Sequence, residues 1–397
     1  MSTPSLPSLD DLPDLHGRRV FVRVDFNVPM QGGEVLDDTR LVQALPTIRE
    51  LLGRGARVAL ASHRGRPKGQ RNLDFSLRPV ALALAELLDH DVAFAEDCVG
   101  TSAEEAIDGL ANGGACLLEN LRFHAGETDN EPDFVAQLAQ LADVYVSDAF
   151  GTAHRAHAST AGVPSRLEHC AAGRLMHREV TVLGGLLSAP QRPFAAALGG
   201  AKISGKIETL ESLVETTDRL IVVGGMANTL LAAQGHAMGR SLVEEDRIDT
   251  AKAVLQRAEE RAVEVLLPRD LVVTDDLDEP SKTETVAVGG VDDDLMAVDI
   301  GPATGALFKE RLADAESVFW NGPAGVFEKP PFDEGSVALA EAVAASSGFT
   351  VIGGGETVAC AKAAGVADQL DHVSTGGGAA LALLAGKELP GVMTLAS

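Results

Sequence analysis

The stretch GGAKISGKIE, residues 199–208, follows the apolar run 194–198 and precedes a segment with helical period. Its second and third glycines and Lys206 have the spacing of a phosphate-binding P-loop, but Ile207 stands where that loop places a serine or threonine. A strand, a glycine-rich turn and a helix in this order are typical of α/β proteins that hold phosphate groups at the turn. The stretch therefore predicts an α/β fold with a phosphate site that differs from a P-loop.

Short apolar segments alternate with longer segments of helical period along both halves of the chain. This alternation indicates two doubly wound parallel-sheet domains with helical connections. In the first half we expect strands at 19–26, 57–62, 115–120 and 143–148, and helices at 76–88, 101–111 and 132–141. In the second half we expect strands at 194–198, 219–223, 264–268, 318–320 and 350–352, and helices at 204–215, 248–261 and 331–345.

The length of 397 residues favours two domains, each large enough for its own core. Pro164, Gly173 and Pro190 bracket residues 174–187, whose apolar positions fit a helix. We interpret this segment as an interdomain helix. The expected boundaries are an N-terminal domain at 1–172, the joining helix at 173–188, a second domain at 189–379 and a C-terminal segment at 380–397.

The composition excludes some classes of partner. With 33 basic and 58 acidic residues the formal charge is −25, which disfavours nucleic acid and anionic membranes. Acidic blocks such as residues 244–246 indicate a solubilising surface or, alternatively, adaptation to high salt. The four cysteines are scattered without a C-x-x-C motif, and the N-terminus lacks the pattern of a signal peptide, so we expect a cytoplasmic protein.

Basic side chains gather where the strands of the first half are expected to end. This set comprises Arg40, His63, Arg64, Arg66, Lys68, Arg71, Arg122, His124, His154, Arg155 and His157. Arginine forks suit carboxylate and phosphate oxygens, and Asp25 and Asn27 can accept hydrogen bonds from a hydroxyl. The pattern predicts a small, multiply anionic ligand that carries a hydroxyl. His154 and His157 have no third metal ligand at suitable spacing, which favours a lining role over a metal site.

Glycine-rich turns follow the strands of the second half, at GGAK (199–202), GGMAN (224–228), WNGPAG (320–325), GGGET (353–357) and STGGG (374–378). Such turns let backbone N–H groups approach phosphate oxygens, so together they indicate a nucleotide-phosphate site. Tight packing of strand on helix is the alternative, and for GGMAN alone the two interpretations have equal weight. No G-x-G-x-x-G fingerprint or Walker B carboxylate is present, which argues against a dinucleotide-binding dehydrogenase and a P-loop NTPase.

The chain resembles the phosphoglycerate kinase family from residue 22 to about residue 380. The shared motifs, in order, are VRVDFNVP, SHRGRP, LLENLRFH, DAFGTAHRAHAST, GGAKISGK, GGMANTL, DIGPAT, WNGPAGVFE, GGGETVA and VSTGGGA. The resemblance implies two Rossmann-like domains, the first binding 3-phosphoglycerate or 1,3-bisphosphoglycerate and the second binding ADP or ATP with Mg²⁺. It also implies an enzyme that moves a phosphoryl group between the acyl phosphate and ADP, with closure of the domains by a hinge motion.

The resemblance also assigns residues to roles. It places Arg40 and Lys202 on the transferring phosphoryl group. It implies a glycerate site formed by Asp25, Phe26, Asn27, Arg40, His63, Arg64, Gly65, Arg66, Arg122 and Arg155. It implies a nucleotide site formed by Lys206, Asn321, Glu328, Gly354, Gly355, Glu356 and Thr357, with Glu356 as the Mg²⁺ ligand.

Two positions depart from the family pattern. Arg64 stands where the family usually has leucine, and Glu356 stands where many members have aspartate, so a contact to Mg²⁺ needs a shifted backbone or a bridging water. The resemblance further suggests that the C-terminal segment packs on the first domain, and we expect a monomer. The competing hypotheses are an NAD-dependent dehydrogenase on a doubly wound fold and a non-catalytic binding protein; retention of Arg40, Lys202 and Lys206 argues against the latter.

Overall fold

The computed structural model describes residues 6–396, and the contacts within it divide the chain into two compact units. The N-unit consists of the described residues as far as Thr181 together with those from Glu388 onward, and the C-unit consists of Val182–Lys387. Residues 380–387 therefore group with the C-unit, and only the last part of the C-terminal segment groups with the N-unit. Within residues 6–396 no helix is both long enough and apolar enough to cross a membrane.

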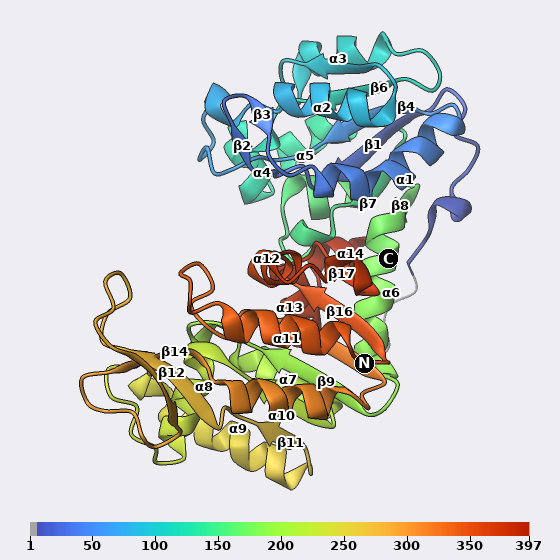
Figure 1. Ribbon diagram of the computed structural model, residues 1–397. Helices are drawn as coiled ribbons and strands as arrows, with labels where there is room; N and C mark the ends of the chain where they lie inside the picture. The colour runs from blue at the N-terminus through green and yellow to red at the C-terminus, as the bar shows by residue number, and fades with distance from the viewer. Residues whose placement is uncertain (1–5, 397) are drawn as a thin grey trace. The chain divides into compact units, whose positions relative to one another are not determined.

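The N-unit contains a six-stranded, fully parallel sheet (Figure 1) with strand order β5-β6-β4-β1-β7-β8. The strands are β1 (Arg19–Val24), β4 (Arg57–Ala61), β5 (Val92–Ala95), β6 (Ala115–Leu118), β7 (Val144–Asp148) and β8 (Cys170–Ala172). The four strands predicted in this half are confirmed, with ends one or two residues shorter. The short edge strands β5 and β8 and the hairpin β2–β3 (Met30–Gln31, Glu34–Val35) were not predicted.

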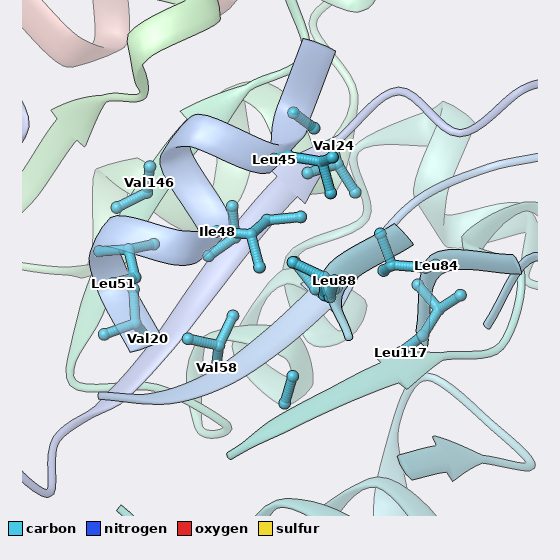
Figure 2. Close-up of a cluster of buried hydrophobic side chains, with 14 of the residues drawn as sticks. Val20, Val24, Leu45, Ile48, Leu51, Val58, Leu84, Leu88, Leu117 and Val146 are labelled. Carbon is cyan, nitrogen blue, oxygen red and sulfur yellow. The ribbon is translucent and has the colours of Figure 1, made fainter. Parts of the chain in front are cut away.

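The N-unit core lies between this sheet and two of its helices (Figure 2). The helices of the unit are α1 (Thr39–Gly53), α2 (Arg78–Leu88), α3 (Gly100–Asp108), α4 (Ala125–Asp129), α5 (Pro132–Ala139) and α14 (Pro390–Ala396). Ile48 of α1 and Leu84 of α2 are fully buried with Val20 and Val58 of the sheet. Helix α1 was not predicted because Pro46 lies inside it, and proline ordinarily ends a helix.

Helix α6 (Arg174–Ser188) begins in the N-unit and continues into the C-unit, as predicted for residues 174–187. Its first turn is anchored within the N-unit. Asp148 Oδ1 accepts a hydrogen bond from the Met176 backbone N–H at 3.1 Å, and Arg174 forms ion pairs with Asp10 and Glu50. Helix α14 also belongs to this unit, where the Gly391 N–H donates to the Ala153 carbonyl at 2.9 Å.

The C-unit contains a second six-stranded parallel sheet, with strand order β11-β10-β9-β15-β16-β17. The strands are β9 (Phe194–Leu198), β10 (Arg219–Val222), β11 (Glu264–Leu266), β15 (Ser317–Asn321), β16 (Phe349–Gly353) and β17 (His372–Ser374). The helices are α7 (Ile207–Thr216), α8 (Gly224–Ala233), α9 (Ile248–Glu260), α10 (Pro302–Leu312), α11 (Glu334–Ala344), α12 (Gly355–Ala363) and α13 (Gly378–Leu384). Two doubly wound parallel sheets are thus confirmed.

A three-stranded antiparallel sheet in the C-unit has no counterpart in the sequence prediction. It pairs β13 (Thr283–Ala287) with β12 (Asp270–Thr274) and β12 with β14 (Met296–Ile300). The outer strand β13 is mostly exposed and polar, so it gives no apolar run for a sequence reading to detect. Strands β12 and β14 lie beside α8 (Figure 1), and the buried Leu271 and Val273 of β12 form a small core with Leu231 of that helix.

Candidate functional site

A basic cavity of about 330 Å³ lies at the carboxyl end of the N-unit sheet, where ligands of parallel α/β sheets bind. It is lined by Arg66, Lys68, Gly69, Arg122, His124, Thr128, Arg155 and His157. Six of these eight residues are cationic or imidazole side chains in a chain whose net charge is −25. The cavity is therefore suited to a small anionic ligand.

The loop that follows β4 forms one side of this site. The Gly65 N–H donates to Asn27 Oδ1 at 2.9 Å, and the Gly65 carbonyl accepts from Arg122 at 2.8 Å. Gly65 has a φ of +63°, and a Cβ there would lie 2.3 Å from the Phe75 ring, so only glycine fits. The loop thus joins Asn27, Gly65 and Arg122, which the sequence placed in one site.

Arg40 lies in the first turn of α1 rather than at the end of a strand, which corrects its predicted position. Its guanidinium pairs with Asp25 Oδ2 at 2.7 Å, and about a third of its side chain remains exposed. Because Asp25 comes directly after β1, this ion pair holds Arg40 near the carboxyl edge of the sheet. Arg40 therefore keeps part of its guanidinium available for a ligand.

Two of the predicted glycerate-site residues have contacts that point away from the cavity. The Phe26 side chain is fully buried in the N-unit core, and its backbone N–H donates to Ser62 Oγ at 2.8 Å. The Arg64 guanidinium donates to the Asp74 carbonyl at 2.6 Å and more weakly to the Ser76 carbonyl. Arg64 thus stabilises the loop before α2, which explains structurally why an arginine stands where the family usually has leucine.

Crowding of positive charge shapes the ionisation of the basic cavity. Burial, and then the neighbouring guanidiniums of Arg155 and Arg23, lower the pKa of Arg122 to about 10. Burial, and then the guanidiniums of Arg122, Arg23 and Arg155, lower the pKa of His157 to about 4, so this imidazole is neutral at pH 7. The Arg122 Nε–H has no hydrogen-bond partner among residues 6–396. An anionic ligand would relieve this repulsion and supply acceptors.

A second cavity, of about 270 Å³, lies at the carboxyl ends of β9, β10 and β15 in the C-unit. Its walls include the backbone of Gly200, Gly224, Gly225 and Gly325 and the side chains of Asn228, Glu328 and Glu356. Glycines at the starts of helices leave backbone N–H groups accessible to phosphate oxygens. The predicted residues Glu328 and Glu356 are thus brought together with three of the predicted glycine turns.

The glycine turns pack closely on one another, which confirms the packing interpretation offered for GGMAN and leaves its phosphate role a prediction. A Cβ on Gly225 would lie 2.2 Å from the Ala201 carbonyl, and one on Gly199 would lie 2.1 Å from the Pro323 carbonyl. The Met226 N–H also donates to the Gly200 carbonyl at 3.1 Å. Close backbone packing therefore sets the shape of the cavity that the same turns line.

Lys206 lies at the start of α7 and is held by protein oxygens. Its ammonium donates to the Gly199 carbonyl at 2.7 Å and to the side-chain and backbone oxygens of Asn321. Burial lowers the pKa of Lys206 to about 8, and the carboxylate of Glu356 acts in the opposite direction. Asn321 also donates to the Gly353 carbonyl, so it links Lys206 to the GGGET turn.

The remaining predicted nucleotide-site residues have different surroundings. Thr357 is buried, and its hydroxyl accepts a hydrogen bond from the Gly322 N–H at 2.7 Å. Gly354 has a φ of +97°, and a Cβ there would lie 2.8 Å from the Asn321 amide nitrogen. Gly355 begins α12. Lys202 is exposed, and within residues 6–396 its ammonium forms no hydrogen bond or ion pair.

The C-unit cavity offers oxygen donors that fit Mg²⁺. Carboxylates of Asp299, Glu328 and Glu356 line it, and Mg²⁺ prefers carboxylate and phosphate oxygens. Asp299 accepts backbone hydrogen bonds from Ile300 and Gly335, and burial raises its pKa to about 7, which makes it a poor cation ligand. Glu356 and Glu328 are therefore the better placed of the three.

The chain thus has two parallel α/β units, each with a cavity at the carboxyl edge of its own sheet, one lined by basic side chains and the other by glycine turns. Comparison with known proteins identifies the family. The sequence model described as phosphoglycerate kinase matches residues 9–387, and the chain belongs to the phosphoglycerate kinase family.

Individual relatives agree with this assignment over the whole chain. The phosphoglycerate kinase of Desulforudis audaxviator is 55% identical over 383 residues, which cover 96% of this chain and 97% of that protein. The phosphoglycerate kinase of Moorella thermoacetica is 52% identical over 388 residues, which cover 98% of each. The structure of the Coxiella burnetii phosphoglycerate kinase matches with a TM-score of 0.89 at 41% identity, covering 98% of this chain and 99% of that one. The dehydrogenase hypothesis finds no support.

Sequence reasoning missed several residues of the two cavities. Gly69 and Thr128 line the basic cavity but carry no charge, so the search for cations passed over them. Asn228 and Leu271 line the second cavity, and Leu271 comes from the unpredicted antiparallel sheet. The GGMAN motif, which ends in Asn228, was the feature of the sequence that could have pointed to this residue.

Proposed function

We propose that this protein transfers a phosphoryl group reversibly between 1,3-bisphosphoglycerate and ADP, giving 3-phosphoglycerate and ATP. The observation that carries the proposal is the basic cavity of the N-unit, which gathers Arg66, Arg122 and Arg155 in a strongly acidic chain. Membership of the phosphoglycerate kinase family supports the same reaction. We assign 3-phosphoglycerate to the basic cavity and the nucleotide to the glycine-lined cavity.

Phosphoryl transfer requires positioning and charge stabilisation more than covalent help from the protein. A carboxylate oxygen of 3-phosphoglycerate attacks the γ-phosphorus of ATP, and the bond to the β,γ-bridging oxygen breaks, leaving ADP. We propose that Arg40 and Lys202 contact the transferring group, because Lys202 is exposed and Arg40 keeps part of its guanidinium exposed beside its ion pair with Asp25. Since they belong to different units, the step needs a closure of the two domains by a hinge motion.

The nucleotide would be held by Lys206 and by the backbone of the glycine turns. Lys206 would exchange its bonds to Gly199 and Asn321 for phosphate oxygens. Glu356 or Glu328, which line the same cavity, would hold Mg²⁺ directly or through water, and Mg²⁺ bound there would supply neutralisation of phosphate charge. We further propose that the protein is cytoplasmic, because its four cysteines are free thiols as is usual in a reducing compartment, and that it acts as a monomer.

A coupled assay tests the proposal directly. The purified protein is supplied with ADP and with 1,3-bisphosphoglycerate generated in place, and ATP formation is followed. We expect Mg²⁺-dependent ATP formation that requires both substrates. A protein that binds ADP and 3-phosphoglycerate but forms no ATP would instead be a non-catalytic binding protein.

A further inference from the structure

A buried charged side chain, Arg23, lies in the N-unit sheet near Arg122 and His157 of the basic cavity. Arg23 belongs to the central strand β1 and is 1% exposed. Because side chains alternate along a strand, Arg23 points to the face of the sheet opposite to that of the core residues Val22 and Val24. A buried guanidinium is costly unless its N–H groups are all directed at acceptors. The acceptors that Arg23 contacts therefore show which neighbouring residues stabilise its buried charge.

Arg23 donates to three different acceptors. Its Nε–H donates to Ser159 Oγ at 2.8 Å, and one terminal nitrogen donates to the Val24 carbonyl. The other terminal nitrogen lies 3.1 Å from Nδ1 of His63. The guanidinium thus links His63, at the end of β4, to Ser159 in the segment Ala158–Gly162.

The contact with Arg23 determines which nitrogen of His63 carries the proton. A guanidinium has only donors, so Nδ1 must accept, and a neutral imidazole then carries its proton on Nε2. Burial, and then the surrounding arginines beginning with Arg23, hold the pKa of His63 well below its usual range, so the ring is neutral. The His63 ring is 4% exposed and makes no other hydrogen bond within residues 6–396. It lies near enough to Arg122 and Arg155 of the basic cavity for their charges to act on it, so its Nε2–H is the group that remains for a ligand there.

Glu127 fixes the other end of this chain of hydrogen bonds. It is fully buried, and its two carboxylate oxygens accept from the Ser159 hydroxyl at 2.6 Å and from the Ser159 N–H at 3.0 Å. Because the Ser159 proton is donated to Glu127, a lone pair of Ser159 Oγ faces the Arg23 Nε–H. Tyr145 also holds this segment by donating its hydroxyl to the Ser159 carbonyl at 2.9 Å.

We propose that Glu127 is a positioning residue that acts through Ser159 and Arg23 to hold His63 as the Nε2–H tautomer, which donates to the phosphoglycerate ligand. The proposal rests on the assignment of that ligand to the basic cavity. Glutamine at position 127 would keep the shape but place an amide against Ser159, where it competes for the hydroxyl oxygen that Arg23 uses. Arg23 would then lose its fixed orientation, and so would the His63 ring.

The tautomer can be observed without any substrate. In protein labelled with ¹⁵N-histidine, two-bond ¹H–¹⁵N spectra distinguish protonated from unprotonated ring nitrogens, and the His63→Gln variant identifies the His63 signals. We expect an unprotonated Nδ1 and a protonated Nε2 in the wild type, and a mixture of tautomers in Glu127→Gln and Ser159→Ala. A protonated Nδ1 in the wild type, or an unchanged tautomer in both variants, would overturn the proposal.

Kinetics provide the second readout. Glu127→Gln and Ser159→Ala should each raise the KM for 3-phosphoglycerate about tenfold, as expected for one weakened hydrogen bond, with kcat and the KM for ATP within about twofold. Asp133→Asn, an exposed carboxylate on the neighbouring helix α5, is the matched control and should change neither constant. A higher KM without a change of tautomer would also contradict the proposal, because it would indicate a merely structural role.

The two readouts separate this proposal from the proposed function. If the wild type forms no ATP, the assignment of the reaction fails while the spectra still report whether Glu127 controls His63. If Glu127→Gln does not fold, the wild-type spectrum and Ser159→Ala still decide the outcome.

Discussion

The two cavities offer different chemical groups to an anionic ligand. The N-unit cavity uses side chains, with arginines supplied by separate loops around one small pocket. The C-unit cavity is lined by backbone from glycine turns, and the half-buried Lys206 lies in the same loop as Gly200. Guanidinium forks select a small ligand with several charged groups, whereas backbone N–H groups suit phosphates that belong to a larger molecule. On the proposed function, a chain of charge −25 would bind two polyanions through local groups rather than through its net charge.

We expect the largest losses of kcat for the two residues assigned to the transferring phosphoryl group. Arg40→Ala and Lys202→Ala should each lower kcat by at least ~10²-fold with the fold intact, because each removes charge stabilisation from the transition state. Steady-state kinetics and circular dichroism of each variant measure this. Arg49→Ala, on the exposed side of α1, and Lys252→Ala, on α9, are the controls. Unchanged turnover in either test variant would remove that residue from the mechanism.

Arg122 and Arg155 should act mainly on ligand affinity in the N-unit. Replacing either by alanine removes charge-assisted hydrogen bonds, and we expect the KM for 3-phosphoglycerate to rise about thirtyfold with a much smaller change in kcat. Arg71→Ala is the matched control, since Arg71 pairs with Glu96 and does not line the cavity. A large loss of kcat at normal KM would refute a simple anchoring role.

Lys206 should give the C-unit site a pH dependence that the N-unit site lacks. Its pKa of about 8 lies below the ordinary lysine value, so the ammonium is present at pH 7 and is lost as the pH rises through 8. The KM for ATP should therefore rise about tenfold between pH 7 and pH 9. Lys206→Gln should show the high value at both pH values, and Lys252→Gln should behave like the wild type. A pH-independent KM in the wild type would contradict this role.

The smallest expected effect concerns the metal. Glu356→Gln removes one carboxylate from the C-unit cavity while Glu328 remains, so we expect a threefold to tenfold higher Mg²⁺ concentration for half-maximal activity. A titration with Mg²⁺ at fixed nucleotide measures this, with the exposed Asp368→Asn on the same unit as control. An unaltered titration would exclude Glu356 as a ligand of the ion.

The parallel strands that are buried on both faces, such as β7 and β9, could be predicted from sequence because they appear as apolar runs, whereas the edge strands β5, β8 and β17 were not predicted. Helix α1 was not predicted because Pro46 lies inside it, and strand β13 was not predicted because it is polar and has no apolar pattern. Motifs located Arg122 and Glu356 at their cavities, but no motif could show that the Phe26 side chain is buried in the core. Hydrogen-bond partners such as Ser159 and Glu127, far apart in sequence from Arg23, become visible only in the fold.

The central claim is that the N-unit binds 3-phosphoglycerate and the C-unit binds the nucleotide. It is tested most directly by measuring both KM values in a variant of each unit. The KM for 3-phosphoglycerate and the KM for ATP are each determined at pH 7 in Arg122→Ala and in Lys206→Gln. We predict that Arg122→Ala raises only the first constant and Lys206→Gln only the second. If each substitution raised both constants to the same extent, the assignment of one ligand to each unit would be contradicted.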